Sequence, residues 1–181
     1  ATMSKIVEKY GRSIVIVPNK DLVRQTEEDY VNCGLDVGVY FGDRKDIGKM
    51  HTICTWQSLN SLLKKTKKGE DNIMDFIEDV ICVIVDEVHQ AKADVLKDLL
   101  TSVFANVPIR WGLTGTIPKA DYEFASLRSS LGEVINRLAA KELQDQGVLA
   151  NCEVNIVQTQ EPSEYTSYQS ALKFLLADKK R

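Results

Sequence analysis

The sequence predicts an α/β domain in which helices cover both faces of a mainly parallel sheet. Short apolar runs of strand length alternate along the chain with longer amphipathic stretches, which is the pattern of β-α-β units. Two of these runs, Ser13 to Val17 and Ile81 to Val85, are apolar at nearly every position, as is typical of strands buried on both faces in the middle of a sheet. The length of 181 residues suits one domain and leaves no room for a second complete one.

The elements follow in a regular order. The apolar runs predict strands at 13–17, 37–40, 52–55, 81–85 and 109–113. Amphipathic stretches predict helices at 21–32, 57–65, 72–79, 91–104, 120–130 and 141–146, the first capped by Asp21 and the last ended by Gly147. Residues 1–10, followed by Gly11, read as the end of a helix, and 163–181 as a further amphipathic helix with a basic end.

Composition excludes several classes of protein. With 44% hydrophobic and 27% charged residues the chain is neither a disordered tail nor a fibrous repeat. The net charge of -3 argues against binding nucleic acid through bulk positive charge but is compatible with a narrow basic stripe. The four cysteines are widely spaced, and neither a signal peptide nor a membrane span is evident, so we expect a cytoplasmic protein with reduced cysteines.

An acidic string, Asp86-Glu87-Val88-His89, follows the second fully apolar strand. Ligands of parallel sheets bind beyond the carboxyl ends of the strands. Phosphoryl transfer needs an oxygen ligand for hydrated magnesium and a carboxylate that orients or deprotonates water, roles that suit Asp86 and Glu87. His89 would connect this site to another part of the protein, although a lone histidine at such a place more often has a structural role.

The next strand leads into Thr114-Gly115-Thr116. Two hydroxyls that flank a glycine allow a sharp turn and hydrogen bonds to neighbouring carboxylates. An ordinary turn that caps the following helix is an equally good interpretation until the neighbouring acidic string is considered.

Together these two strand exits resemble motifs II (a DExH box) and III of the superfamily 2 helicases and translocases. Further pieces occur in the matching order. They are Ile16 to Gln25, similar to motif Ia; Thr55-Trp56-Gln57-Ser58-Leu59, similar to the next family segment; and Lys141 to Leu149, similar to the stretch that closes the first motor domain. Within the superfamily, the phage UvsW type of DNA helicase is the nearest resemblance.

The resemblance implies an ATP-driven motor of two RecA-like domains, with ATP and Mg²⁺ between them and a nucleic acid across both. Residues 1–160 would form the first domain, a three-layer α/β/α structure, and 161–181 a helical linker towards a second RecA-like domain. The partner would be single-stranded or branched DNA, or RNA, and hydrolysis would drive unwinding or branch remodelling in DNA repair or recombination. A phage-encoded protein would act in the host cytoplasm.

The same resemblance implies roles for further residues. Thr114, Gly115 and Thr116 would couple nucleotide and nucleic-acid sites. Backbone phosphates would meet the turns after the first and third strands, at Pro18, Asn19, Lys20, Arg24, Thr55, Trp56 and Gln57. For Trp56, base stacking competes with a half-buried core position, which is more common. The dense run Lys64 to Lys68 reads as a solvated loop or a contact to a duplex.

One family element has no counterpart in the sequence. The phosphate-binding loop G-x-x-x-x-G-K-[ST] is missing. The segment Gly42 to Met50 is similar to this motif but does not match it. It has one residue too many between its glycines, and it has methionine where the motif needs a hydroxyl. The remainder of the loop's helix should be residues 1–10, so the domain is expected to be N-terminally truncated. We therefore expect ATP hydrolysis from the intact protein and not from this fragment.

Two other interpretations compete. A non-catalytic doubly wound domain could bind nucleic acid or a partner and use the acidic string as a metal site, as receiver domains do, but Pro18 and Trp56 stand where a receiver needs acidic residues. A restriction-type translocase subunit or a chromatin-remodelling motor would share the motifs described above.

Overall fold

A computed structural model describes residues 2–70, 72–89, 93–117, 120–155, 167–169 and 172. The chain divides into two compact units, Ala1–Ile135 and Asn136–Arg181, and each is described by itself. The first unit contains the sheet and all the site residues predicted from the sequence.

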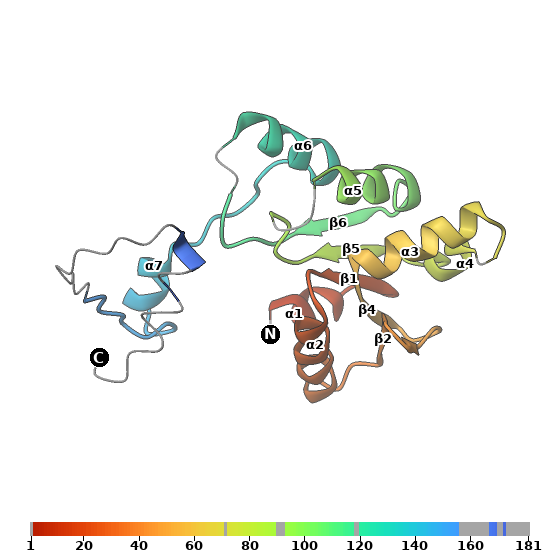
Figure 1. The fold of residues 1–181 in the computed structure, drawn as a ribbon. Coiled ribbons are helices and arrows are strands. Elements are labelled where there is room, and N and C mark those ends of the chain that lie inside the picture. The colour runs from red at the N-terminus through yellow and green to blue at the C-terminus, as the bar shows by residue number, and fades with distance from the viewer. Residues whose placement is uncertain are drawn as a thin grey trace. The chain divides into compact units, whose positions relative to one another are not determined.

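The sheet of the described chain has six strands in the order β3-β2-β4-β1-β5-β6 (Figure 1). The strands are β1 Ser13–Val17, β2 Val37–Phe41, β3 Arg44–Lys45, β4 His51–Thr55, β5 Cys82–Val85 and β6 Ile109–Gly112. All neighbours pair in parallel except β2 and β3, which form an antiparallel hairpin. The mainly parallel sheet expected from the sequence is confirmed, and the carboxyl ends of five strands share one edge.

Helices lie on both faces of the sheet, which gives three layers (Figure 1). One face is covered by α1 Thr2–Val7 and α2 Lys20–Asn32. The other face is covered by α3 Trp56–Lys67, α4 Ile73–Ile77, α5 Ala93–Asp98, a π-helix at Leu99–Val103 and α6 Asp121–Leu131.

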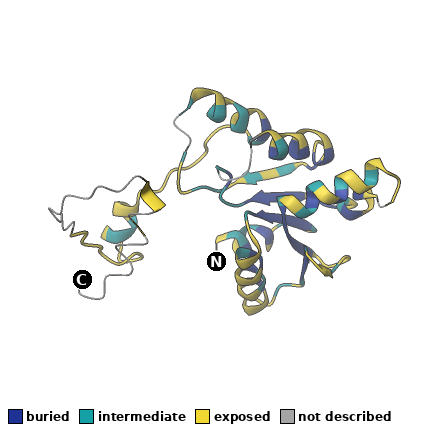
Figure 2. Ribbon diagram, in the orientation of Figure 1, coloured by how far each residue is buried: buried dark blue, intermediate teal, exposed yellow. Residues whose placement is uncertain are grey.

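The central strands supply side chains to both layers. In β1, Ile14 and Ile16 belong to the core under α3 to α6, whereas Val15 and Val17 belong to the core under α1 and α2. Because successive side chains of a strand point to opposite faces, a strand that is covered on both sides must be apolar throughout. Figure 2 shows this buried centre, and every residue of β1 and β5 is buried.

Several predicted element ends need correction. The structure adds β3, whose two exposed residues give no apolar signal. Asp21 is not the cap of the first long helix: Asn19 is the N-cap, and its Oδ1 accepts from the N–H groups of Asp21 and Leu22. Helix α1 ends at Val7, before the predicted 10. Gly11 therefore does not end it. A Cβ there would lie 3.3 Å from Ile81, which indicates that close packing favours glycine.

The second unit contains α7, Ala140–Asp145. Gly147 has a φ of 70°, and the N–H of Val148 bonds to the carbonyl of Leu143, so this helix stops at a glycine as predicted. Most of the helix predicted at 163–181, and the expected boundary at 160, lie outside the described residues. Among the residues described, no helix has the length and apolar character needed to cross a bilayer.

Candidate active site

The exits of β5 and β6 lie side by side at the carboxyl edge of the sheet. Val85 is in register with Gly112. Beyond the strands, the N–H of Leu113 donates to the carbonyl of Val85 at 2.8 Å, and the N–H of Val88 donates to Leu113 at 3.1 Å. These bonds extend the pairing past the strand ends and bring the acidic string next to the threonine turn.

Three predicted residues meet there. His89 Nδ1 lies 2.6 Å from Thr114 Oγ1 and 3.3 Å from Glu87 Oε2. The Thr114 hydroxyl also donates to the carbonyl of Thr116 at 2.8 Å and accepts from the Thr116 N–H at 3.1 Å. Gly115 lies between them; a Cβ on it would meet no atom within 4 Å and its φ is not positive, so neither packing nor backbone conformation requires glycine at this position.

The direction of the contact between His89 and Thr114 depends on the histidine tautomer. The Thr114 hydroxyl has one proton, which it donates either to the carbonyl of Thr116 or to His89 Nδ1. When that proton goes to Thr116, the hydroxyl oxygen accepts from a protonated Nδ1. Glu87 Oε2, although within ion-pair distance of the same nitrogen, is buried without a hydrogen-bond partner. An unpartnered carboxylate oxygen is available to act as a base.

Glu87 also has an unusual backbone conformation. Its φ is 46°, in the left-handed region that residues other than glycine rarely adopt. Such a conformation costs on the order of 1–3 kcal/mol and persists only where the surroundings impose it. Here the flanking backbone is fixed on both sides, by the bond from Asp86 N–H to Ile16 and by the bond from Val88 N–H to Leu113.

Asp86 is half-buried at the same edge. Burial raises the pKa of its carboxyl, and the neighbouring charge of Glu87 raises it further, against a hydrogen bond from the Glu87 backbone. Two adjacent carboxylates fit a hydrated divalent cation, and no described Lys or Arg side chain forms an ion pair with Asp86. No cluster of three or more His, Cys, Asp or Glu residues that could hold a metal ion occurs in the described chain. Protein-bound Mg²⁺ usually keeps several waters and takes only one or two carboxylates.

The turn after β1 lies next to this site. Asn19 and Lys20 are exposed and Pro18 is half-buried. The side-chain oxygen of Asn19 is occupied by the cap of α2. Lys20 and Arg24 lie on exposed positions of the first turns of that helix.

The turn after β4 lies on the other side of β1, because Val17 is in register with Thr55. Thr55 is buried, and its hydroxyl caps α3 by accepting from the N–H of Ser58. Trp56 is partly buried and packs against the core. Gln57 is exposed, and its Nε2 donates to the carbonyl of Pro18 at 3.4 Å, which links the two turns.

Comparisons with known proteins identify the family and the fold. Residues 1–119 match the family described as type III restriction enzyme, res subunit. The chain belongs to this family. The matched range of the res-subunit family contains every site residue predicted from the sequence, from Pro18 to Thr116. A search of curated proteins found no match.

Solved structures share the fold of this res-subunit family member. The UvsW helicase from bacteriophage T4 is 18% identical with a TM-score of 0.56, and the match covers 71% of this chain and 45% of that one. The Pyrococcus furiosus Hef helicase domain is 17% identical with a TM-score of 0.53, covering 72% and 29%. The chain therefore spans less than half of either structure. The predicted resemblance to the first RecA-like domain of superfamily 2 helicases, UvsW among them, is confirmed.

Some features of the res-subunit domain had no signal in the sequence. The left-handed backbone of Glu87 is one, since a glycine or asparagine would normally mark such a position. The segment from Gly42 to Met50 forms the β3 hairpin and a loop into β4, not a strand, loop and helix. The lysine run 64–68 lies at the carboxyl end of α3, the end away from the Thr55 turn. Lysines there also suit the helix dipole.

Proposed function

We propose that this chain is the first motor domain of a longer ATP-dependent helicase or translocase that acts on nucleic acid. The observation that supports this most directly is the contact group of Glu87, His89 and Thr114 at the carboxyl edge, one strand away from the turn at Pro18. Family membership and the fold point to the same class of protein.

Within this proposal the two carboxylates have different roles. Mg²⁺, when bound with ATP, would neutralise charge that develops on the phosphates. Asp86 would hold the hydrated ion, because its carboxylate is half-buried at the carboxyl edge and burial disfavours its charge unless a cation compensates it. Glu87 would orient and deprotonate the attacking water, because its carboxylate is partly exposed at the carboxyl edge and one of its oxygens has no hydrogen-bond partner.

A nucleic acid would lie across the exits of β1 and β4. The exposed side chains there that carry donors suit phosphate contacts, and they are Asn19, Lys20, Arg24 and Gln57. Thr55 and Trp56 are placed less favourably, since one caps a helix and the other packs on the core. Single-stranded or branched DNA is the proposed partner, and RNA is an alternative substrate that would meet the same side chains.

Coupling between the two sites has a short route. The Asp86 N–H donates to the carbonyl of Ile16 at 2.9 Å, and Ile16 is two residues before Pro18. A shift of the acidic string on nucleotide binding would therefore reach the β1 turn directly through backbone atoms. His89 and Thr114 connect the same string to the exit of β6.

The test uses the full-length protein that contains this domain. ATP turnover is measured with and without single-stranded and branched DNA, for the wild type and for Glu87→Gln. Loss of a general base should lower kcat by roughly 10²–10⁴ while ATP still binds. Glu28→Gln, an exposed change on α2, is the matched control and should keep full activity. Full turnover by Glu87→Gln would refute the role assigned to Glu87.

The 181-residue chain alone should bind ATP weakly, because its sequence contains no G-x-x-x-x-G-K-[ST] loop to hold the phosphates. A submicromolar dissociation constant would contradict this. Unwinding and translocation are separated by assaying strand displacement from a branched duplex against displacement of a protein block from intact duplex. The family description favours testing translocation as well as branch remodelling.

A further inference from the structure

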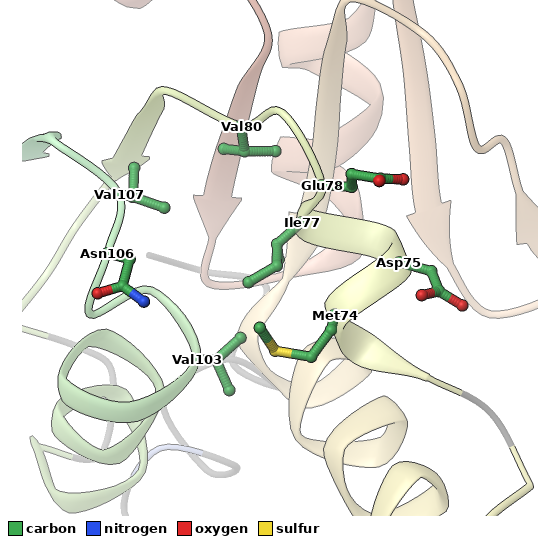
Figure 3. Close-up of a pocket in the computed structure, with 8 residues that line it drawn as sticks. All are labelled: Met74, Asp75, Ile77, Glu78, Val80, Val103, Asn106 and Val107. Atoms are coloured by element: carbon green, nitrogen blue, oxygen red, sulfur yellow. The ribbon is translucent and has the colours of Figure 1, made fainter.

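A cavity of about 360 Å³ opens between α4 and the segment that joins the π-helix to β6 (Figure 3). Pockets that take ligands range from about 300 to 1,000 Å³. Val80, Val103 and Val107 are buried around it, and Ile77 is half-buried. The buried part of the lining is therefore apolar, and the cavity has enough room for an aliphatic side chain.

An exposed methionine completes the apolar part of the lining. Met74 lines the cavity and is 53% exposed. Val103 is the last residue of the π-helix, a type of turn that is rare and is found frequently at functional sites. A flexible, exposed methionine beside buried valines can adapt its shape to an aliphatic group.

The outer rim on the α4 side is acidic. Asp75 and Glu78 line the cavity, and Asp79 follows them along the chain. Both lining carboxylates are exposed, and Figure 3 shows them at the edge of the apolar lining and pointing outward. Asp75 accepts a hydrogen bond from Asn72 at 2.7 Å, which fixes its position. The part of a ligand that extends out of the cavity would thus lie next to negative charge.

The cavity lies far from the proposed motor site. Val80 and Val107 precede β5 and β6, whereas Asp86 and Leu113 follow these strands. Four residues of strand separate the two edges by about 13 Å. A molecule bound here would leave the nucleotide and nucleic-acid edge open, and the acidic rim would repel phosphate.

We propose that this cavity docks a segment of another protein that presents an aliphatic side chain flanked by lysine or arginine. The aliphatic side chain fills the space between Val80, Val103 and Val107. The flanking cations lie over Asp75 and Glu78, and Met74 covers the stem. This inference does not depend on the proposed motor function, because it rests on the opposite edge of the sheet.

The test uses three peptide probes and NMR of the 181-residue chain. Acetyl-Lys-Leu-Lys-amide should shift the amide signals of Val103, Asn106 and Val107 on titration. Acetyl-Lys-Ser-Lys-amide lacks the aliphatic group and acetyl-Glu-Leu-Glu-amide reverses the charge. Each should bind at least tenfold more weakly. Equal binding of the glutamate peptide, or no shift at these residues with any probe, overturns the proposal.

Substitutions at exposed positions test the same binding with little effect on folding. Glu78→Lys, at an exposed position, should weaken binding of the lysine peptide roughly three- to tenfold by charge reversal. Glu28→Lys makes the same charge change on α2, on the other face of the sheet, and should leave the affinity unchanged. The opposite ranking of these variants contradicts the proposal. Self-association of the chain that Met74→Glu abolishes would assign the cavity to a second copy and would also overturn it.

Discussion

His89 Nδ1 lies 2.6 Å from the hydroxyl oxygen of Thr114, across the exits of two neighbouring strands. The same nitrogen lies 3.3 Å from Glu87 Oε2, which has no hydrogen-bond partner. In the tautomer with a proton on Nδ1, the imidazole can donate to either oxygen, and Thr114 is the nearer. In the proposed motor, this contact keeps the base available and ties it to the exit of β6.

Replacing Thr114 should therefore impair Glu87 indirectly. In Thr114→Val the imidazole loses its hydroxyl partner, and Nδ1 is free to donate its proton to Glu87 and occupy the base. We expect kcat of the full-length ATPase to fall roughly tenfold, the effect of one hydrogen bond of about 1–1.5 kcal/mol, with KM for ATP unchanged. Thr114→Ser keeps the hydroxyl and should retain most of the activity. A normal kcat for the valine variant would mean that Thr114 does not control His89.

The backbone of Glu87 predicts a conflict between stability and activity. Its φ of 46° suits glycine better than any residue with a Cβ. We expect Glu87→Gly to be more stable than Glu87→Ala by about 1–2 kcal/mol in urea unfolding, although both lack the carboxylate and both should be inactive. Because both variants lack the glutamate side chain, the difference between their free energies of unfolding measures the cost of the backbone conformation. Equal stability of the two variants would show that the conformation is not strained.

The sheet was predictable because its strands must be apolar on both faces. Residues 13–17 form β1 as predicted, and 82–85 fall within the predicted 81–85. β3 had no such signal, since both of its residues are exposed and its pairing depends on the hairpin turn. The predicted helix at 91–104 corresponds to an α-helix followed by a π-helix, a change of hydrogen-bond pattern that residue types do not encode.

The site was predictable in its residue types and not in its contacts. Strand exits place Glu87 and Thr114 at one edge once β5 and β6 are known to be neighbours. Which proton His89 carries depends on the Thr114 hydroxyl, and that depends on distances the sequence does not specify. Likewise Thr55 has the right residue type for a phosphate contact, but burial and capping of α3 use its hydroxyl.

Asp86 should make the stability of the fold depend on pH. Burial, and then the charge of Glu87, raise the pKa of Asp86 above its ordinary value of 3.8. The protonated form is therefore favoured in the folded chain. Protonation of Asp86 therefore contributes to the free energy of unfolding. This contribution is fully present below pH 3.8 and is lost as the pH rises through the pKa of Asp86 in the folded chain.

The variant Asp86→Asn tests this pH dependence. At pH 7 its free energy of unfolding should exceed that of the wild type, and the difference should shrink as the pH is lowered through the folded pKa of Asp86. Urea unfolding at several pH values between 4 and 7 measures the difference. Asp43→Asn, an exposed change in the hairpin, is the control, and its difference in free energy of unfolding from the wild type should not change with pH in this way. A difference that grows towards low pH would have the wrong sign.

Asn19 allows the capping role to be separated from a nucleic-acid role, because both functions fall on one side chain. Its Oδ1 accepts from two backbone N–H groups at 2.9 and 3.0 Å, so Asn19→Ala should destabilise the chain by about 1 kcal/mol. Asn19→Asp keeps the acceptor, and its charge suits the start of a helix, so stability should be preserved.

The aspartate at this position would, however, place a negative charge beside Lys20 on the proposed nucleic-acid edge. We expect Asn19→Asp to weaken binding of single-stranded DNA by the full-length protein, with a shallower dependence on salt, while Asn19→Ala binds nearly as well as the wild type wherever it is folded. Fluorescence anisotropy at several salt concentrations, next to urea unfolding, measures both effects. If Asn19→Asp binds DNA as tightly as the wild type, the nucleic acid does not pass the β1 turn, because an added carboxylate at a phosphate contact must repel it.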